Sequence, residues 1–133
     1  MNISEVSKKF DLTPDTLRYY EKKRLTLPVT RDKNNNRAYT EYDLKWVYFA
    51  KVIRKAGVSV EALAQYVALF KQGREESMED RQEILLQQKQ ALQQKIADLN
   101  EALDYLSHKM ENNGKHLTQF EKTLDPDENS DLG

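Results

Sequence analysis

Residues 12–21 read Leu-Thr-Pro-Asp-Thr-Leu-Arg-Tyr-Tyr-Glu, and this stretch predicts a short amphipathic helix. Thr13 is a favourable N-cap, and Pro14 suits the first helical position, where its missing N–H has no helical partner to lose. Leu17 and Tyr20 lie three residues apart and can pack inward together. The other faces carry polar side chains, namely Thr16, Arg18, Tyr19, Lys22 and Lys23. Such a helix alone is typical of many protein surfaces, so its neighbours decide the interpretation.

A second helix is predicted directly before this stretch, from Asn2 to about Phe10. Asn2 can cap it, and Glu5 lies at the third helical position, which is a variant of the capping box. Ile3, Val6 and Phe10 fall on one apolar face. Two helices joined by a tight turn form the helix-turn-helix arrangement, in which the second helix offers its N-terminal half to DNA base edges.

The segment after the second helix is basic and rich in turn-forming residues. Pro28 favours an extended chain, and the asparagines at positions 34–36 suit a tight turn because Asn tolerates positive φ. We therefore predict a β-hairpin wing over residues 28–40, with Arg31, Lys33 and Arg37 close to the second helix. A solvated polar loop is the alternative interpretation.

These residues together resemble the N-terminal DNA-binding domain of the MerR family of bacterial transcription regulators. The most specific part of the resemblance is the core Thr16-Leu17-Arg18-Tyr19-Tyr20-Glu21. The other matching positions are Ile3-Ser4-Glu5-Val6, Leu12-Thr13, Leu25, Pro28, Arg37-Ala38-Tyr39, Leu44 and Gly57-Val58-Ser59. The resemblance covers residues 1–75 and extends more weakly to about residue 110.

The resemblance implies a homodimer that binds a pseudo-palindromic element of double-stranded promoter DNA and distorts its spacer, so that RNA polymerase can engage the promoter. It also implies that Arg37 and Tyr39 contact phosphate and the minor groove. On chemical grounds, Arg18 can read guanine, whereas Tyr19 and Lys23 suit the phosphate backbone. The predicted DNA-binding residues are Thr13, Thr16, Arg18, Tyr19, Lys22, Lys23, Arg31, Arg37 and Tyr39.

Three positions depart from the family's usual pattern, because Asp11, Arg24 and Asn35 stand where glycine is common. Asp and Asn visit the left-handed region with little strain, whereas Arg24 is expected to cost about 1 kcal/mol relative to glycine. The chain is also similar to the subgroup that senses aldehyde or nitrosative stress, in which a cysteine of the third helix is the usual sensor. Val52 takes that place, so we expect no thiol-reactive effector, and a small-molecule effector is left unidentified.

Further helices are predicted downstream. The sequence Thr40-Glu41-Tyr42-Asp43 is a capping box that opens a helix over about 41–56, and Ser59 caps another over about 60–72. A second capping box, Ser77-Met78-Glu79-Asp80, opens a long helix. This helix carries an apolar heptad stripe of Leu85, Leu92, Ile96, Leu99, Leu103, Leu106 and Met110. An exposed stripe needs a partner, so we predict dimerisation, and the resemblance implies an antiparallel coiled coil.

The predicted fold is all-α with a small β wing. It comprises a winged helix-turn-helix domain over residues 1–75, a coiled-coil dimerisation helix over 76–111, and a short C-terminal helix (115–124) with a disordered acidic tail within 112–133. Residues 1–75 hold 15 basic and 9 acidic side chains, whereas residues 76–133 hold 6 and 13. The basic half suits nucleic acid, although the whole chain has a net charge of −1.

Composition argues against several other classes of function. The chain has no cysteine, no apolar run that could span a membrane and no signal-peptide pattern, so we expect a cytoplasmic protein without a membrane partner. It has no Gly-rich phosphate loop or nucleophile motif, so we expect no enzymatic activity and no cofactor. His108 follows Asp104 by four residues and precedes Glu111 by three, but two histidines without cysteine predict no metal site.

Two other functions are compatible with these patterns. In one, the chain is an interaction adaptor whose heptad helix pairs with a different protein. In the other, it is an architectural DNA-binding protein similar to phage excisionases. The long heptad stripe makes the second alternative weaker, because an architectural module has no need of it.

Overall fold

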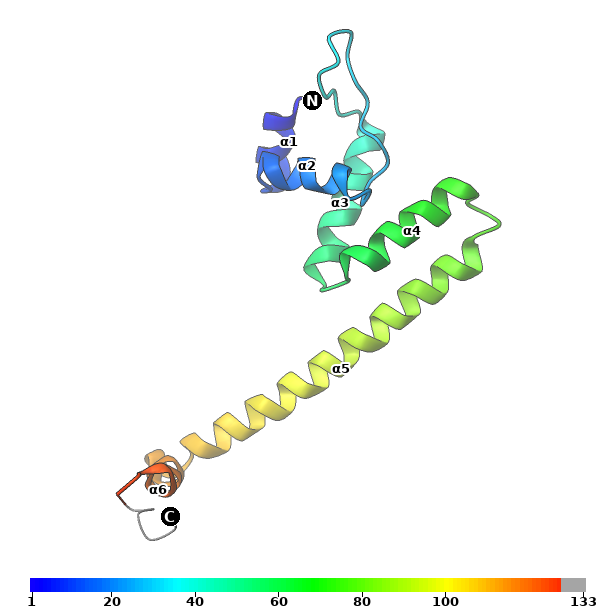
Figure 1. The fold of residues 1–133 in the computed structure, drawn as a ribbon. Helices are drawn as coiled ribbons and strands as arrows, with labels where there is room; N and C mark the ends of the chain where they lie inside the picture. Colours follow the sequence, from blue (N-terminus) through cyan, green and yellow to red (C-terminus); the bar gives the residue numbers. More distant parts are fainter. Residues whose placement is uncertain (128–133) are drawn as a thin grey trace. The chain divides into compact units, whose positions relative to one another are not determined.

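The computed structural model describes residues 1–127, which are mainly helical (Figure 1). The elements are α1 Ile3–Phe10, α2 Pro14–Lys22, α3 Glu41–Lys55, α4 Val60–Gln72, α5 Met78–Met110, η1 Asn112–Gly114 and α6 Lys115–Leu124. The chain divides into two compact units, Met1–Gln90 and Ala91–Gly133. None of the described helices combines the length and the apolar character that crossing a membrane requires.

Helices α1 and α2 begin with the capping interactions that the sequence predicts. The Asn2 side chain accepts the N–H of Glu5, and the Glu5 side chain accepts the N–H of Asn2, both at 2.9 Å. The Thr13 hydroxyl accepts the N–H of Thr16 at 3.0 Å. Between the two helices, Asp11 has a left-handed backbone with φ of 53°. This residue turns the chain within the short space that a helix-turn-helix arrangement allows.

Two hydrophobic clusters hold the first unit together. One contains Val6, Leu17, Val29, Tyr39, Leu44 and Val47, and the other contains Tyr20, Leu25, Ala50, Val58, Leu63 and Val67. Helix α2 contributes Leu17 to the first cluster and Tyr20 to the second, as its predicted inward face requires. Because α2 is anchored in both clusters in this way, its opposite face is fixed at the surface.

Helices α3 and α4 also begin and end close to their predicted bounds. The Thr40 hydroxyl accepts the N–H of Asp43 at 3.2 Å, and Asp43 Oδ2 accepts the N–H of Thr40 at 2.9 Å, which completes the predicted capping box. Gly57 follows α3 with φ of 92°, a conformation that favours glycine. The Ser59 hydroxyl then caps α4 by accepting the N–H of Ala62 at 3.1 Å.

The segment over residues 28–40, called the hairpin loop below, is a minimal hairpin. Among the described residues it forms one isolated antiparallel bridge, between Arg31 and Arg37, and no extended strand. The N–H of Ala38 donates to the carbonyl of Thr30 at 2.7 Å and continues this pairing. In Figure 1 the loop, drawn in cyan, projects away from the helices that precede and follow it. The predicted hairpin is therefore present within residues 28–40, as one bridged pair and not as two extended strands.

The junction between α4 and α5 differs from the predicted capping box. The Ser77 hydroxyl donates to the carbonyl of Gly73 at 2.6 Å and accepts from Nε of Arg81 at 2.9 Å, so it does not serve as the N-cap. Arg81 is only 5% exposed, and its guanidinium lies 5.6 Å from the Tyr66 ring centroid and 5.5 Å from that of Phe70. Arg81 therefore packs the start of α5 against α4. The sequence analysis assigned no role to this residue.

In the second unit α5 continues as a single helix to Met110, and the predicted stripe is open to solvent. Leu99, for example, is 68% exposed and Leu103 is 60% exposed. The 3₁₀ turn η1 then leads into α6, whose bounds match the predicted short helix over 115–124. Of the predicted acidic tail, residues 128–133 lie outside the described residues.

Candidate nucleic-acid interface

The solvent-facing side of α2 carries the polar residues that the sequence predicts for DNA contact. The hydroxyls of Thr13 and Thr16 are hydrogen-bonded to each other at 2.8 Å. Arg18, with half of its side chain exposed, has Nη1 at 2.9 Å from Oδ1 of the still more exposed Asp15, and Tyr19 is exposed beside it. An exposed ion pair of this kind contributes little to stability, so the guanidinium can exchange its carboxylate for another acceptor.

Glu21, near the C-terminal end of α2, ties the hairpin loop to the helix. Its Oε2 accepts the N–H of Val29 at 2.7 Å, while its Oε1 accepts from Nε of Arg37 at 2.9 Å and lies 3.3 Å from Nη2 of Arg31. The Glu21 side chain is 16% exposed, and charge-assisted bonds shielded from water in this way are comparatively strong. The sequence analysis missed this role, because Val29, Arg31 and Arg37 lie 8, 10 and 16 positions after Glu21.

The two loop arginines keep donors free for an anion while they hold Glu21. Each guanidinium has five N–H donors, and only part of each set faces the carboxylate. Arg31 is 39% exposed at its side chain and Arg37 is 24% exposed. Two positive charges around one negative charge leave the base of the loop with a net positive charge. This arrangement suits a phosphate group approaching from solvent.

Tyr39 does not lie where the family resemblance implies. Its side chain is 3% exposed and belongs to the cluster with Val6 and Leu17. Burial raises the pKa of the Tyr39 hydroxyl, so the group stays protonated, and its oxygen has no hydrogen-bond partner among the described residues. The backbone explains the inward position, because the N–H of Tyr39 donates to the Met1 carbonyl at 2.7 Å and pulls this residue against α1. In this structure the Tyr39 side chain is thus not placed for a surface contact, and its contact with DNA stays a prediction.

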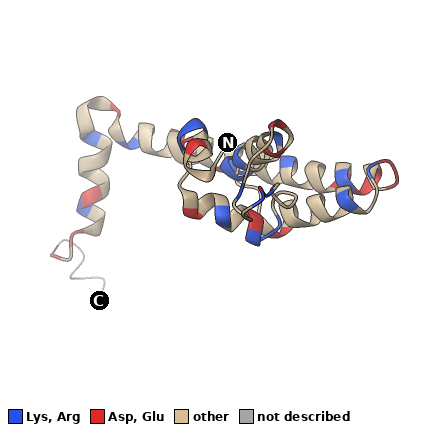
Figure 2. Ribbon diagram, turned by 90° about the horizontal axis from the view of Figure 1, so that it is seen from above, with Lys and Arg blue, Asp and Glu red and all other residues tan. Residues whose placement is uncertain are grey.

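The remaining predicted residues are found at the surface to different degrees. The exposed ones are Thr13, Arg18, Tyr19, Lys22, Lys23 and Arg31, and the partly exposed ones are Thr16 and Arg37. The structure adds residues that the sequence analysis did not consider, because Lys51, Arg54 and Lys55 of α3 line a groove that Thr16 and Tyr19 of α2 also line. Figure 2 marks the Lys and Arg positions along the ribbon in blue. Basic residues of α2, α3 and the hairpin loop thus border the exposed face of α2, where Lys51 and Arg54 donate to the carbonyls of Phe10 and Val58.

Asp43 holds the base of the hairpin loop through hydrogen bonds to Thr30 and Thr40. Its Oδ2 accepts the N–H of Thr40 at 2.9 Å, the Thr40 hydroxyl at 3.0 Å and the N–H of Thr30 at 3.3 Å. Burial raises the pKa of this carboxyl, but the hydrogen bonds from Thr40 and Thr30 lower it by more, so the pKa of Asp43 lies below its ordinary value. The ionised carboxylate therefore joins the loop to the start of α3.

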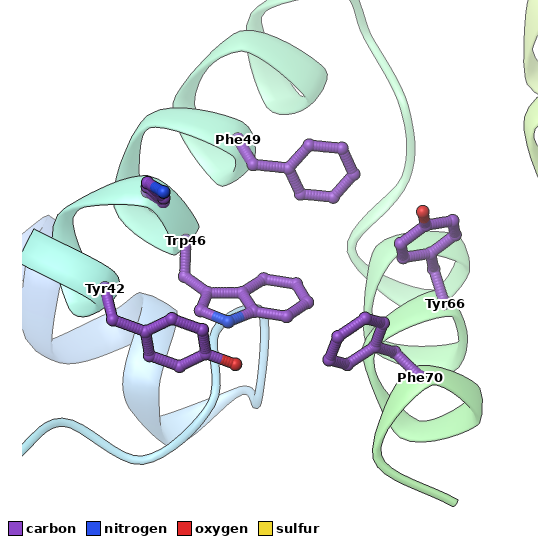
Figure 3. Close-up of a pocket in the computed structure, with 6 residues that line it drawn as sticks. Tyr42, Trp46, Phe49, Tyr66 and Phe70 are labelled. Atoms are coloured by element: carbon purple, nitrogen blue, oxygen red, sulfur yellow. The ribbon is translucent and has the colours of Figure 1, made fainter. Parts of the chain in front are cut away.

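A small aromatic pocket lies on another side of the first unit, between α3 and α4 (Figure 3). Trp46 packs edge-on against Phe70 with ring centroids 5.0 Å apart, and Phe49 lies 5.3 Å from Tyr66. Tyr42 and Lys45 form its rim. The rings from the two helices contact one another across the pocket, so they pack α3 against α4.

Comparison with known protein families gives two matches that overlap along the chain. The family described as MerR HTH family regulatory protein matches residues 1–69, and the family described as MerR, DNA binding matches residues 44–109. Together these matches cover the helices α1 to α4 and nearly all of α5.

Individual relatives and solved structures agree with the two family matches. The HTH-type transcriptional regulator AdhR of Bacillus subtilis is 47% identical over 92 residues, which span 69% of this chain and 65% of AdhR. A crystal structure of a MerR family transcriptional regulator from Listeria monocytogenes superposes with a TM-score of 0.81 at 38% identity, covering 100% of this chain and 99% of that one. HiNmlR, a MerR family regulator lacking the sensor domain and bound to promoter DNA, gives a TM-score of 0.73 at 27% identity, covering 82% and 86%.

Proposed function

Because the chain belongs to the MerR family of regulatory proteins, we propose that it binds double-stranded promoter DNA and regulates transcription. The observation that carries this proposal is the bonding of Glu21, which joins α2 and the hairpin loop into one surface. Around that carboxylate, exposed basic and hydroxyl side chains come from both elements. The promoter-bound relative HiNmlR, which has a similar fold, supports the same function.

We propose a winged helix-turn-helix mode of contact. Helix α2 enters the major groove, where Arg18 leaves Asp15 and donates to a guanine edge. Tyr19 and Lys23 contact phosphates beside it, and the hairpin loop acts as the wing with Arg31 and Arg37 directed to the backbone and minor groove. The basic residues of α3 extend the phosphate contacts.

We further propose that two copies of the chain bind a pseudo-palindromic element together. The exposed apolar stripe of α5 supports pairing as an antiparallel coiled coil, because a solvent-exposed row of leucines at heptad spacing is unfavourable unless a partner covers it. Two modules then contact two half-sites and deform the promoter spacer for RNA polymerase. The deformation costs on the order of a few kcal/mol, which phosphate contacts offset.

Fluorescence anisotropy at two salt concentrations tests DNA binding. One duplex carries the DNA upstream of the gene that encodes this protein, and the other carries the same bases in scrambled order. We expect tight, salt-dependent binding to the first duplex and weaker binding to the second. Equal and weak binding to both duplexes, together with a monomeric mass by light scattering, would instead support the interaction-adaptor alternative.

Variants of α2 separate base reading from phosphate contact. We expect Arg18→Ala to weaken binding by about 1–3 kcal/mol on the cognate duplex and to reduce sequence preference. Lys23→Ala should weaken binding to both duplexes equally and lower the salt slope by about one unit. Lys122→Ala removes one exposed positive charge from α6 in the second unit and serves as the control. An equal loss on both duplexes for Arg18→Ala would contradict base reading.

A further inference from the structure

A groove lies between helix α4 and the C-terminal end of α2 with the segment that follows it, and its volume is about 910 Å³. It is called the α2–α4 groove below, and its lining includes Lys23, Arg24, Thr26, Leu27, Val67 and Lys71. Mainly apolar pockets of this size with a few convergent polar groups commonly bind small molecules. We propose that the α2–α4 groove binds a small organic carboxylate with an apolar body. The inference goes beyond DNA binding and stands whether or not the chain binds DNA.

Three cations border the groove without an acidic partner. Lys23 and Arg24 come from the end of α2, and Lys71 comes from α4. All three residues are exposed, and none of their side chains forms an ion pair or a hydrogen bond within residues 1–127. Glu21 also lines the groove, but both of its carboxylate oxygens are already bonded to the hairpin loop. Positive charges around a concave, partly apolar surface raise the local concentration of anions, so the groove favours a negatively charged ligand.

The backbone of Arg24 gives an independent reason to assign its side chain a function. Arg24 has φ of 60°, in the left-handed region that side chains other than those of Asn and Asp rarely adopt. The N–H of Arg24 donates to the Glu21 carbonyl at 3.1 Å, and that of Leu25 donates to the Tyr20 carbonyl at 2.8 Å, so the turn is held in this form. Backbone strain of this kind collects at functional sites. A guanidinium at the groove repays the strain if its forked donors bind a carboxylate.

Thr26 adds a hydroxyl that has no partner. The residue is only 5% exposed and lines the groove. Its hydroxyl forms no hydrogen bond within residues 1–127, yet it is not sealed off from solvent as the Tyr39 hydroxyl is. A polar group this deeply placed usually has a hydrogen-bond partner. A ligand carboxylate in the groove would accept from the Thr26 hydroxyl and supply that partner.

Apolar side chains form the rest of the lining and select the other part of the ligand. Leu27 and Pro28 lie on one side, and Ala64, Val67 and Ala68 of α4 lie on the other. The two alanines are small, so they leave room for an apolar group beside the helix. An inorganic anion would contact only the cations, and a neutral apolar compound would contact only this surface. A carboxylate with an apolar body uses both.

Titration calorimetry of the full-length, tag-free protein without DNA tests the site. The probes are cinnamate, which has an aromatic body, and octanoate, which has an aliphatic one. The comparison ligands are cinnamamide, which has the same aromatic body without the charge, and inorganic phosphate, which has the charge without a body. We expect saturable binding of one carboxylate per chain, with at least tenfold weaker binding of cinnamamide and of phosphate.

Two substitutions separate ligand binding from folding. Arg24→Gly removes backbone strain, and Thr26→Val removes an unpaired hydroxyl while keeping the shape of the side chain, so neither should lower the urea midpoint. Each should weaken carboxylate binding at least tenfold, and Lys71→Gln should weaken it by a smaller factor. Lys8→Ala removes an exposed positive charge from α1, outside the groove, and should bind as the wild type does.

Four results would overturn the proposal. The first is no saturable binding of either carboxylate at millimolar concentration. The second is equal affinity for cinnamate and cinnamamide, because that result assigns the groove to neutral compounds. The third is phosphate binding as tight as carboxylate binding, which assigns the cations to the DNA backbone, since Lys23 also belongs to the proposed DNA surface. The fourth is unchanged affinity in both Arg24→Gly and Thr26→Val, which places the bound carboxylate elsewhere.

Discussion

At the scale of single residues, the left-handed positions show how a resemblance predicts backbone conformation. Asp11, Arg24 and Asn35 stand where the family commonly has glycine, and they adopt φ of 53°, 60° and 62°. The expectation from sequence is thus confirmed at every one of these positions. Asp and Asn tolerate this region because their short polar side chains bond locally, whereas Arg24 gains no such compensation.

Replacing Arg24 by glycine should therefore stabilise the protein. We expect Arg24→Gly to raise the free energy of unfolding by about 0.5–1 kcal/mol, because the left-handed strain disappears while Gly costs some unfolded-state entropy. Urea denaturation followed by circular dichroism measures this change in the free energy of unfolding. Lys22→Gly, which removes a neighbouring positive charge within α2, should lower stability by about 1 kcal/mol. Destabilisation by both variants would contradict the assigned strain.

The stabilisation by Asp43 should depend on pH. Its folded pKa lies below the unfolded value, so its contribution is present above the unfolded pKa and is lost as the pH falls through the folded pKa. We expect Asp43→Asn to lower the unfolding free energy by about 1–3 kcal/mol at neutral pH. The difference between the variant and the wild type should shrink below pH of about 4. A difference that stays constant between neutral and acidic pH would argue against an ionised Asp43.

At the scale of elements, the buried Arg81 joins α4 to α5. No carboxylate pairs with its guanidinium within residues 1–127. Its stabilisation comes from the aromatic rings and from the hydrogen bonds that Arg81 donates to the Ser77 hydroxyl, the Tyr66 hydroxyl and the Arg74 carbonyl. A desolvated cation against two ring faces is held by cation–π attraction and by packing of its aliphatic stem. Arg81 therefore links α5 both to the rings of α4 and to the connecting loop at Ser77 and Arg74.

Truncation of Arg81 should weaken that joint. We expect Arg81→Ala to lower the unfolding free energy by about 2 kcal/mol, because both ring contacts and the Ser77 hydrogen bond disappear. Thermal and urea unfolding measure the change. Arg74→Ala, an exposed arginine in the same connection, should change stability by less than about 0.5 kcal/mol. Equal losses of unfolding free energy in the two variants would show that Arg81 stabilises the connection no more than an exposed arginine does.

The elements differ in how far the sequence predicted them. Side-chain caps at Asn2, Thr13, Thr40 and Ser59 act locally, so the starts of α1 to α4 were predicted correctly. The bonds of Glu21 to the hairpin loop join residues 8 to 16 positions apart, and no local pattern encodes them. The same reason explains Tyr39, whose inward position depends on pairing with Met1. Local chemistry thus predicted the helices, whereas the contacts that assemble the site required the structure.

At the scale of the whole molecule, the exposed stripe of α5 leads to the proposed dimer. A charge placed in this stripe should separate the two copies. We expect Leu99→Glu to shift the mass measured by light scattering from dimer to monomer and to weaken binding to a two-half-site duplex at least tenfold. Gln90→Glu introduces the same side chain outside the stripe and should leave both properties unchanged. A dimeric Leu99→Glu variant would place the interface elsewhere.

The positive φ of Arg24 also has a consequence for how this protein can evolve. Every arginine codon becomes a glycine codon through a single-base change, so the stabilising replacement is always one mutation away. A lineage that alters the exposed face of α2 to recognise a different operator can lose stability in the process. Position 24, at the end of the same helix, offers a nearby compensating substitution that touches neither hydrophobic cluster.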